Sequence, residues 1–347
     1  MLLLCRLHLV EYATRSYATP RRGTVNNNLR AQEERAARRV QCTLSTRVVS
    51  APSAEMMSAS SPFVDEGRDA VVMLSSSTTR KYFAQHVASV ASALFFNPAV
   101  EVHVHTAYDH QIMAAELLKL PFVQARESRA MQRLHFHSLS PRPSGLSESK
   151  RLYRAWKLEL LQQLPARRSM YIDGDVITCK RLDPVFDLLE QFDLACSHSH
   201  LPHTKLPKFA ASTSFRGANV PAAFTGCNGG VLGVRNGSAA HVNVLQRWAA
   251  CVRDGRERYD MPCLASLMWR NPAKNYYVLP PEFNVRPNTP AGVGVTDPWL
   301  IHTLYGADTL AQQLGSVSNG SCLRQLREAG VLVTLRGGSR GGSQRGP

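Results

Sequence analysis

The sequence has no apolar run long enough to cross a membrane. A transmembrane helix needs roughly 18–20 consecutive apolar residues, whereas the opening "MLLLCRLHLV" is short and is interrupted by Arg6 and His8. We therefore expect a chain without a transmembrane segment, located in the cytoplasm or in an organelle. Residence in the Golgi would require that the N-terminus be incomplete, with an anchor upstream.

Several nucleotide- and metal-binding signatures are absent too. The chain contains neither a P-loop nor a G-x-G-x-x-G turn, and its eight cysteines include no C-x-x-C pair. An EF-hand is excluded, because Ile177 and Pro184 occupy positions five and twelve after a D-x-D start. We expect ordinary, often buried thiols rather than zinc fingers or a dense disulfide framework.

Acidic residues are few beside basic ones, and the formal net charge is +15. Much of the excess lies at the ends, since residues 1–54 hold nine Arg against three Glu and the tail 336–347 adds three Arg. We predict a disordered or targeting leader and linker over 1–66 and a flexible Gly/Arg tail over 336–347. With aromatic residues at 7%, the middle of the chain gives little support for nucleic-acid binding.

Between these flanks, short apolar runs alternate with helical patterns. Residues 69–74 and 100–106 have the pattern of strands, whereas apolar residues over 83–94 recur at helical spacing. Further strands are expected within 134–139, 169–172, 192–198 and 228–234, and helices within 111–120, 149–164 and 242–252. This alternation predicts a Rossmann-like, mostly parallel α/β sheet with flanking helices. Without an internal repeat, we predict a single domain over 67–335.

Two aspartates stand where a buried strand is expected to end. The apolar run "SMYI" leads directly to Asp173 and Asp175, and ligands of open parallel sheets bind at the carboxyl ends of strands. Two such close carboxylates repel each other unless a cation lies between them, and hard oxygen ligands favour Mn²⁺ or Mg²⁺. An ion held there can bind a diphosphate. Alternatively, one Asp forms a turn and the other pairs with Arg181.

The segment "YRAWKLELLQQLPARRSMYIDGDVITCKRLDPVF" resembles the core of the metal-dependent GT-A fold glycosyltransferases. It is most similar to glycogenin-type (family eight) enzymes and related nucleotide-diphospho-sugar transferases. The similarity continues in the family's order through "FTGCNGGVLGV", "YDMPCL", "LPPEFNVRP" and "LIHTLYG", over about 230 residues from Ala70 to Gly306. It implies transfer of a hexosyl or pentosyl group from a UDP-sugar to a hydroxyl of a carbohydrate, protein or lipid, with retention of configuration.

The resemblance also implies roles for matching residues. Asp173, Asp175 and His302 would hold Mn²⁺ (or Mg²⁺), and Asp260 would join the two aspartates in catalysis by contacting the transferred sugar. Contacts to the donor would come from Ser75, Ser76, Lys157, Asp173, Asn228, Gly229 and Gly230. Structural roles stay open for three residues: His302 could be a core histidine, Lys157 a solvated helix cation and Asp260 a helix N-cap.

The chain departs from the family pattern in two places. Met261 stands where the family usually has Gln, and no Lys-Pro-Trp follows His302, so the phosphate-binding Lys is unassigned. Arg324 or Arg327 could replace it. Two other functions remain open: a non-catalytic basic binding module of the same fold, and a sugar nucleotidyltransferase. The second would need a Gly-rich phosphate loop early in the chain, where "SSSTTRKY" is a poor match.

Overall fold

The structure is a computed structural model, and it describes twelve stretches of the chain. These are residues 65–75, 80–125, 127–139, 149–198, 212, 216–221, 224, 226–253, 260–271, 275–287, 294–303 and 320–332. Most of the predicted leader, the predicted tail and Ser76 lie outside them. The first strand begins at Asp65, two residues inside the predicted leader. No helix within the described stretches combines the length and the apolarity that crossing a bilayer requires.

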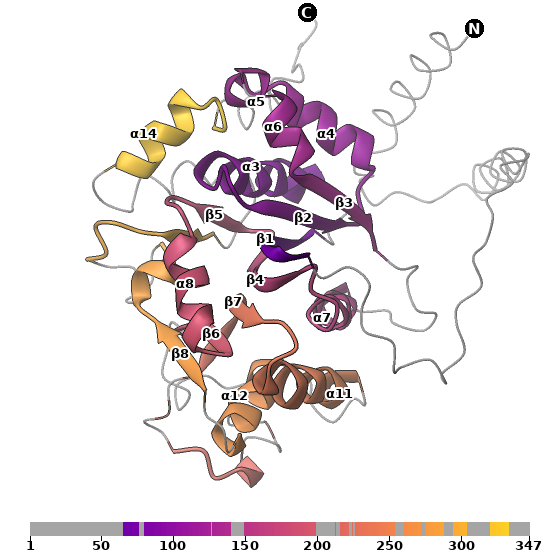
Figure 1. Ribbon diagram of the computed structural model, residues 1–347, viewed down its shortest axis with the longest axis vertical. Helices are drawn as coiled ribbons and strands as arrows, with labels where there is room; N and C mark the ends of the chain where they lie inside the picture. The colour runs from indigo at the N-terminus through magenta and orange to yellow at the C-terminus, as the bar shows by residue number, and fades with distance from the viewer. Residues whose placement is uncertain are drawn as a thin grey trace, which may run out of the picture. The chain divides into compact units, whose positions relative to one another are not determined.

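A seven-stranded mixed sheet forms the centre of the described part of the chain (Figure 1), in the order β3-β2-β1-β4-β7-β6-β8. Its strands are β1 (Asp65–Ser75), β2 (Glu101–Thr106), β3 (Leu134–Ser138), β4 (Ala166–Asp173), β6 (Leu194–His198), β7 (Cys227–Arg235) and β8 (Tyr276–Leu279). Strand β1 pairs in parallel with β2 and β4, β2 with β3, and β6 with β8, whereas β7 runs antiparallel to β4 and β6. The predicted mostly parallel α/β sheet is confirmed.

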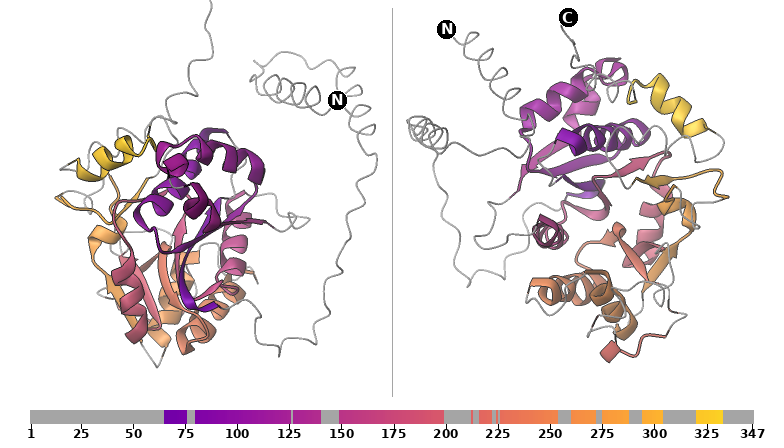
Figure 2. Two further views of the ribbon diagram at one scale, coloured as in Figure 1. Left: turned by 45° about the horizontal axis from the view of Figure 1, so that its top comes forward. Right: turned by 180° about the vertical axis from the view of Figure 1, so that it is seen from behind.

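Helices cover both faces of this sheet (Figure 2). One face packs on α3 (Arg80–Phe96), α4 (His110–Leu118), α5 (Pro121–Ala125) and α8 (Asp183–Gln191), and the other on α7 (Ser149–Leu160), α11 (Arg247–Arg253) and α12 (Asp260–Arg270). Val71 and Met73 of β1 belong to the first core, and Ala70, Val72 and Leu74 to the second. Because β1 is covered on both sides, it is apolar throughout rather than alternating.

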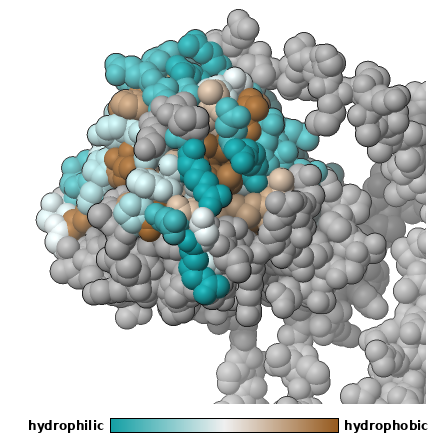
Figure 3. All heavy atoms as spheres, turned by 90° about the horizontal axis from the view of Figure 1, so that it is seen from below, coloured by the Kyte–Doolittle hydropathy of each residue, from teal (hydrophilic) through white to brown (hydrophobic). Residues whose placement is uncertain are grey.

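The described surface is mixed in character. Seen from below, hydrophilic residues cover much of the coloured face, with hydrophobic ones between them (Figure 3). Exposed large hydrophobic side chains among the described residues are Tyr82, Ile112, Leu118, Val242 and Tyr277. They come from four different elements, as expected of ordinary surface positions.

A second, two-stranded sheet brings distant parts of the chain together. Strand β5 (Val176–Thr178) runs antiparallel to β9 (Leu300–His302), and Val176 lies opposite His302. The amide of Thr303 donates to the carbonyl of Asp175 at 2.9 Å, which continues the pairing. In the sequence, the short helix η3 (Pro281–Asn284) precedes β9 and the helix α14 (Ser321–Glu328) follows it. His302 is thus fixed beside the D-G-D turn by backbone hydrogen bonds.

The two predicted helices next to the site differ from their expected bounds. The helix expected over 149–164 ends at Leu160, because the next backbone bonds are short-range turns, such as Gln163 N to Leu160 O at 3.0 Å. Pro165 restricts the residue before it and so opposes continuation of the helix. The helix expected over 242–252 begins as a π-helix, η2 (His241–Gln246), before α11.

The expectation of unpaired cysteines is wrong for six of the eight. Disulfides join Cys179 to Cys322, Cys196 to Cys227 and Cys251 to Cys263, with Cα–Cα distances of 5.1, 5.5 and 6.6 Å. Two of these bridges span 143 and 31 residues. Pairing over such separations depends on the folded topology, so cysteine spacing alone cannot predict it.

Candidate functional site

The D-G-D turn follows β4 at the carboxyl edge of the parallel strands. Asp173 is the last residue of β4, and Leu74 of β1 is its neighbour in register. A Cβ atom at Gly174 would lie 2.6 Å from the carbonyl oxygen of Leu74 and 2.9 Å from Cδ2 of His86. Only glycine therefore fits between the two aspartates, because the turn passes directly against a neighbouring backbone.

Asp173 is held by a network of hydrogen bonds on one side. The hydroxyls of Tyr153 and Tyr171 each donate to its Oδ1 at 2.6 Å, and Lys157 Nζ lies 3.4 Å from the same oxygen. Burial by itself would raise the pKa of Asp173, but Lys157, His302 and the two tyrosines hold that pKa below its usual value. Asp173 is therefore an anchored carboxylate whose other oxygen, Oδ2, faces away from this network.

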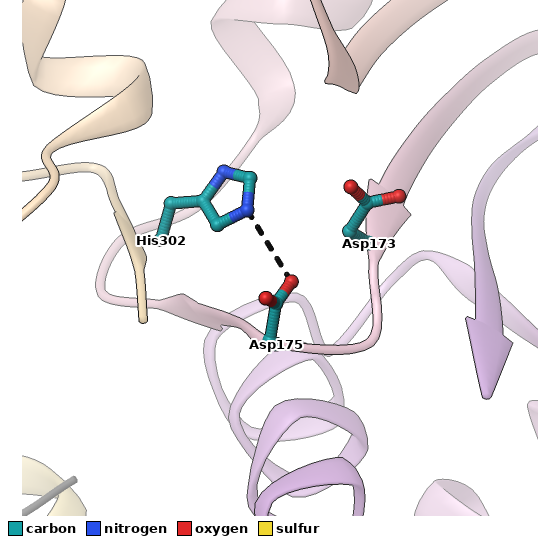
Figure 4. Close-up of side chains that lie close together, drawn as sticks. All are labelled: Asp173, Asp175 and His302. Carbon is teal, nitrogen blue, oxygen red and sulfur yellow. Dashed lines mark ion pairs between the residues drawn. The ribbon is translucent and has the colours of Figure 1, made fainter. Parts of the chain in front are cut away.

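His302 is oriented by Asn284. The amide nitrogen of Asn284 donates to the carbonyl of His198 at 3.0 Å, so its Oδ1 faces Nδ1 of His302 at 2.9 Å. The ring is thereby fixed with Nε2 facing the acidic turn, 3.3 Å from Oδ1 of Asp175 (Figure 4). An unprotonated Nε2 and a carboxylate oxygen can each donate an electron pair to a cation placed between them.

The three predicted ligands lie together. Asp173, Asp175 and His302 each offer one ligand atom, and these atoms all lie within 4.8 Å of one another. Two carboxylates and one imidazole suit Mn²⁺ or Mg²⁺ with open positions left for a ligand. A Cβ at Gly230 would collide with Oδ2 of Asp173 and lie 2.9 Å from Cε1 of His302. Only glycine therefore lets β7 pass this close to both ligand residues, and the cluster could bind a divalent metal.

The remaining predicted residues are placed as follows. Asn228 is buried and its Oδ1 accepts from the amide of Gly230 at 2.7 Å, while Gly229 lies against Trp248 and Nζ of Lys157. Asp260 begins α12, and its carboxylate lies 3.7 Å from Nε of Arg154 on α7. Ser75 is buried and hydrogen-bonded to Nδ1 of His86, whose pKa burial lowers to about 4.

Two of the structural alternatives are wrong. Arg181 pairs with Asp183, through bonds of 2.8 and 3.0 Å, and with neither aspartate of the turn. Lys157 is not a solvated helix cation: its side chain is 3% exposed, and Nζ also lies 5.1 Å from the ring centre of Tyr171. Burial of an ammonium is tolerated here because the carboxylate of Asp173 compensates its charge.

Sequence reasoning missed four residues of the site: Tyr153, Tyr171, Asn284 and Arg286. Tyr171 precedes Asp173 by two residues and so shares its face of the strand, and Tyr153 precedes Lys157 by one helical turn. These spacings could have revealed both tyrosines. Asn284 and Arg286 come from "LPPEFNVRP", a segment in which no residue had been given a role.

A cavity of about 470 Å³ lies elsewhere. It is lined by Leu94, Phe95, Pro98, Phe122, Ala125, Arg129, Ala130 and Arg133. These residues end α3, form α5 and α6 (Glu127–Gln132), and precede β2 and β3, so they gather at the amino edge of the parallel strands. The cluster of Asp173, Asp175 and His302 lies at the opposite, carboxyl edge, and no residue that lines the cavity belongs to it.

Comparison with known proteins supports the fold. No protein-family profile matches the chain, and no curated protein matches it in sequence. Among solved structures, the bifunctional glycosyltransferase WbbM in its apo form aligns with a TM-score of 0.51 at 13% identity. The alignment covers 78% of this chain, which spans about half (53%) of the WbbM chain.

Two further solved structures align less well. The galactosyltransferase LgtC in complex with donor and acceptor sugar analogues gives a TM-score of 0.46 at 14% identity, covering 72% of this chain and 96% of its own. The apo glycosyltransferase GlyE of Streptococcus pneumoniae TIGR4 gives 0.44 at 16%, covering 76% and 64%. Scores below 0.5 are too low to argue from. The likeness to WbbM shows that the chain has the mixed α/β fold of a glycosyltransferase of known structure.

Proposed function

We propose that the chain is a metal-dependent glycosyltransferase that moves a sugar from a nucleoside-diphosphate sugar to a hydroxyl group. The observation that carries this proposal is the cluster of Asp173, Asp175 and His302 at the carboxyl edge of the sheet. The fold shared with WbbM supports it, as do the family-like segments found in the expected order. By the same resemblance we propose a UDP-sugar donor, Mn²⁺ (or Mg²⁺) and retention of configuration.

The residues of the cluster would bind the metal ion in a fixed orientation. Asp173, Asp175 and His302 would hold the divalent ion, which when bound supplies positive charge against a departing diphosphate. The tyrosine hydroxyls fix Oδ1 of Asp173, so the direction of Oδ2 is set before any ligand arrives. Such preorganised charge costs no rearrangement during the reaction.

The Gly-rich start of β7 would form the wall for the sugar. Asn228 holds the amide of Gly230, and the two glycines let the backbone of β7 pack directly against Lys157 and Asp173. The start of β7 is therefore held close to the groups that would bind the donor. Asp260, on α12, would contact the transferred sugar, and the end of β1 at Ser75, with Ser76 beyond it, would lie near the nucleobase and ribose.

The test is an incubation of the protein with a panel of nucleotide sugars, with and without Mn²⁺, and an assay of released nucleoside diphosphate. We expect release that needs the ion and stops on addition of a chelator. Asp175→Asn should abolish release, whereas Asp187→Asn, an identical change at an exposed position of α8, should leave it unchanged.

Three outcomes would count against the proposal. Turnover that persists in chelator would contradict the role of the metal. Ion-dependent nucleotide binding without any turnover would favour the non-catalytic module of the same fold. Release of pyrophosphate from a nucleoside triphosphate and a sugar phosphate would instead favour the nucleotidyltransferase.

A further inference from the structure

Two cations lie beside the metal-ligand cluster, and they have different surroundings. Lys157 is 3% exposed and lies against Asp173 and the rings of Tyr171 and Trp248. Arg286 lies beside His302, with Nη2 at 3.4 Å from Nδ1 and 3.5 Å from Nε2. The guanidinium is therefore close to both ring nitrogens of a predicted metal ligand.

The formal charges of these groups favour an anionic ligand. The two carboxylates of Asp173 and Asp175 and the two cations of Lys157 and Arg286 cancel, so a bound divalent ion would leave the group with an excess of about two positive charges. Without Arg286 the excess would be about one. A diphosphate, with two or more negative charges, matches the larger excess, and a low-dielectric site strengthens such attraction.

Lys157 is an unsuitable partner for this ligand. Its side chain is only 3% exposed, and Nζ lies against Oδ1 of Asp173 at 3.4 Å. A Cβ added at Gly229 would lie only 3.2 Å from Nζ, which shows how closely β7 covers this ammonium. Arg286 is only partly buried. Its guanidinium is planar and presents several N–H groups in a fixed arrangement, which matches phosphate oxygens better than an ammonium does.

The backbone fixes Arg286 relative to the cluster. Val285, the residue before it, donates to the carbonyl of Leu300 at 3.0 Å and accepts from the amide of His302 at 2.8 Å. Val285 also forms a parallel bridge with Ile301. Arg286 is therefore attached directly to the strand that carries His302, and its position is set by the same hydrogen bonds. Burial lowers the pKa of Arg286, whereas Asp175 and Asp173 raise it, so both carboxylates act on this guanidinium.

We propose that Arg286 binds the diphosphate of the nucleotide donor. This inference rests on the proposed function, and it assigns the cation that the sequence left open after His302. Arg324 and Arg327 are less suitable, because both are exposed on α14. That helix is joined by Cys322 to Cys179, at the end of β5 remote from the cluster.

The experiment measures binding rather than turnover. The affinities of the full chain for Mn²⁺ alone, and for inorganic pyrophosphate and UDP at saturating Mn²⁺, are determined by calorimetric titration. Arg286→Met and Arg286→Lys are compared with wild type, and Arg324→Met is the matched control. Circular dichroism and thermal unfolding establish that each variant is folded.

For Arg286→Met we expect pyrophosphate and UDP to bind about 10- to 100-fold more weakly, since a charge-assisted contact is lost. The affinity of Arg286→Met for Mn²⁺ alone should equal or exceed that of wild type, because the variant lacks a positive charge beside the metal ligands. Arg286→Lys should recover part of the loss, and Arg324→Met should show none. Pyrophosphate contacts no nucleobase site, so this result does not depend on the choice of UDP.

Three results would overturn the inference, and they are distinguishable. If wild type binds pyrophosphate and UDP with Mn²⁺ and folded Arg286→Met binds both equally well, Arg286 is not the diphosphate ligand, while the proposed function stands. The same holds if the variant loses Mn²⁺ affinity in parallel, since Arg286 then supports only the cluster. If wild type binds neither probe, the proposed function and this inference fail together.

Discussion

A single methyl group at Gly230 should remove metal binding while leaving the fold intact. The added Cβ of Gly230→Ala would lie 2.9 Å from Cγ of Asp173 and from Cε1 of His302, whereas ordinary contacts begin near 3.4 Å. Each ligand would have to retreat by about 0.5 Å. Metal–ligand distances tolerate about 0.2 Å, so we expect Mn²⁺ affinity to fall by about 100-fold or more, beyond what outer contacts usually cost.

The controls lie on the same strand and on the surface. Gly233→Ala would place a Cβ 3.0 Å from Val185 and 3.2 Å from Ala195, and Gly217→Ala would meet nothing within 4 Å. Overpacking should lower the free energy of unfolding of both β7 variants by about 1–3 kcal/mol. Only Gly230→Ala should lose Mn²⁺ binding in calorimetric titration. Wild-type affinity in a folded Gly230→Ala protein would show that the ion does not bind between Asp173 and His302.

Three further predictions concern the surroundings of the site. Asn284→Leu should weaken Mn²⁺ binding by about 10- to 100-fold, because His302 would lose the hydrogen bond that orients its ring. Equal affinity in a titration would contradict this role of Asn284. Thermal stability should fall as the pH drops below about 6.5, because burial and repulsion from neighbouring histidines lower the pKa of His103 to about 3 and of His105 to about 4, so the unfolded chain binds more protons. His103→Gln should flatten this dependence in melts between pH 7 and 5, and an unchanged slope would exclude the histidine as its source. Reduction of the disulfides should lower the melting temperature, since bridges restrict the unfolded chain, and identical melts with and without reductant would refute this.

The sheet was predictable because most of its strands have a recognisable pattern in the local sequence. The alternation of Val102 and Val104 with polar residues marks β2, and the apolar run before Asp173 marks β4. The direction of β7 was not predictable in this way. A strand buried on both faces reads the same whether it pairs parallel or antiparallel, and only long-range contacts decide. The single domain over 67–335 stays a prediction.

The site divides along similar lines. Asp173 and Asp175 were found from their own chemistry, whereas His302 required a resemblance, since nothing near it in sequence indicates a metal ligand. Arg286 and Asn284 were not found at all. Their significance comes from the pairing of Val285 with β9, a contact between segments that only the folded chain brings together.

The reversed direction of β7 has a consequence for how such a protein could change its substrate. Because β7 opposes β4, its beginning rather than its end reaches the acidic turn, and Ile172 is paired with Val231. Strand β6 ends at the same edge, because His198 is paired with Cys227 at the start of β7. Changes in length or sequence between these two residues need not shift Gly230, since the pairing of β7 with β4 and β6 fixes it. Under the proposed function, acceptor preference could then diverge among related chains while donor binding is retained.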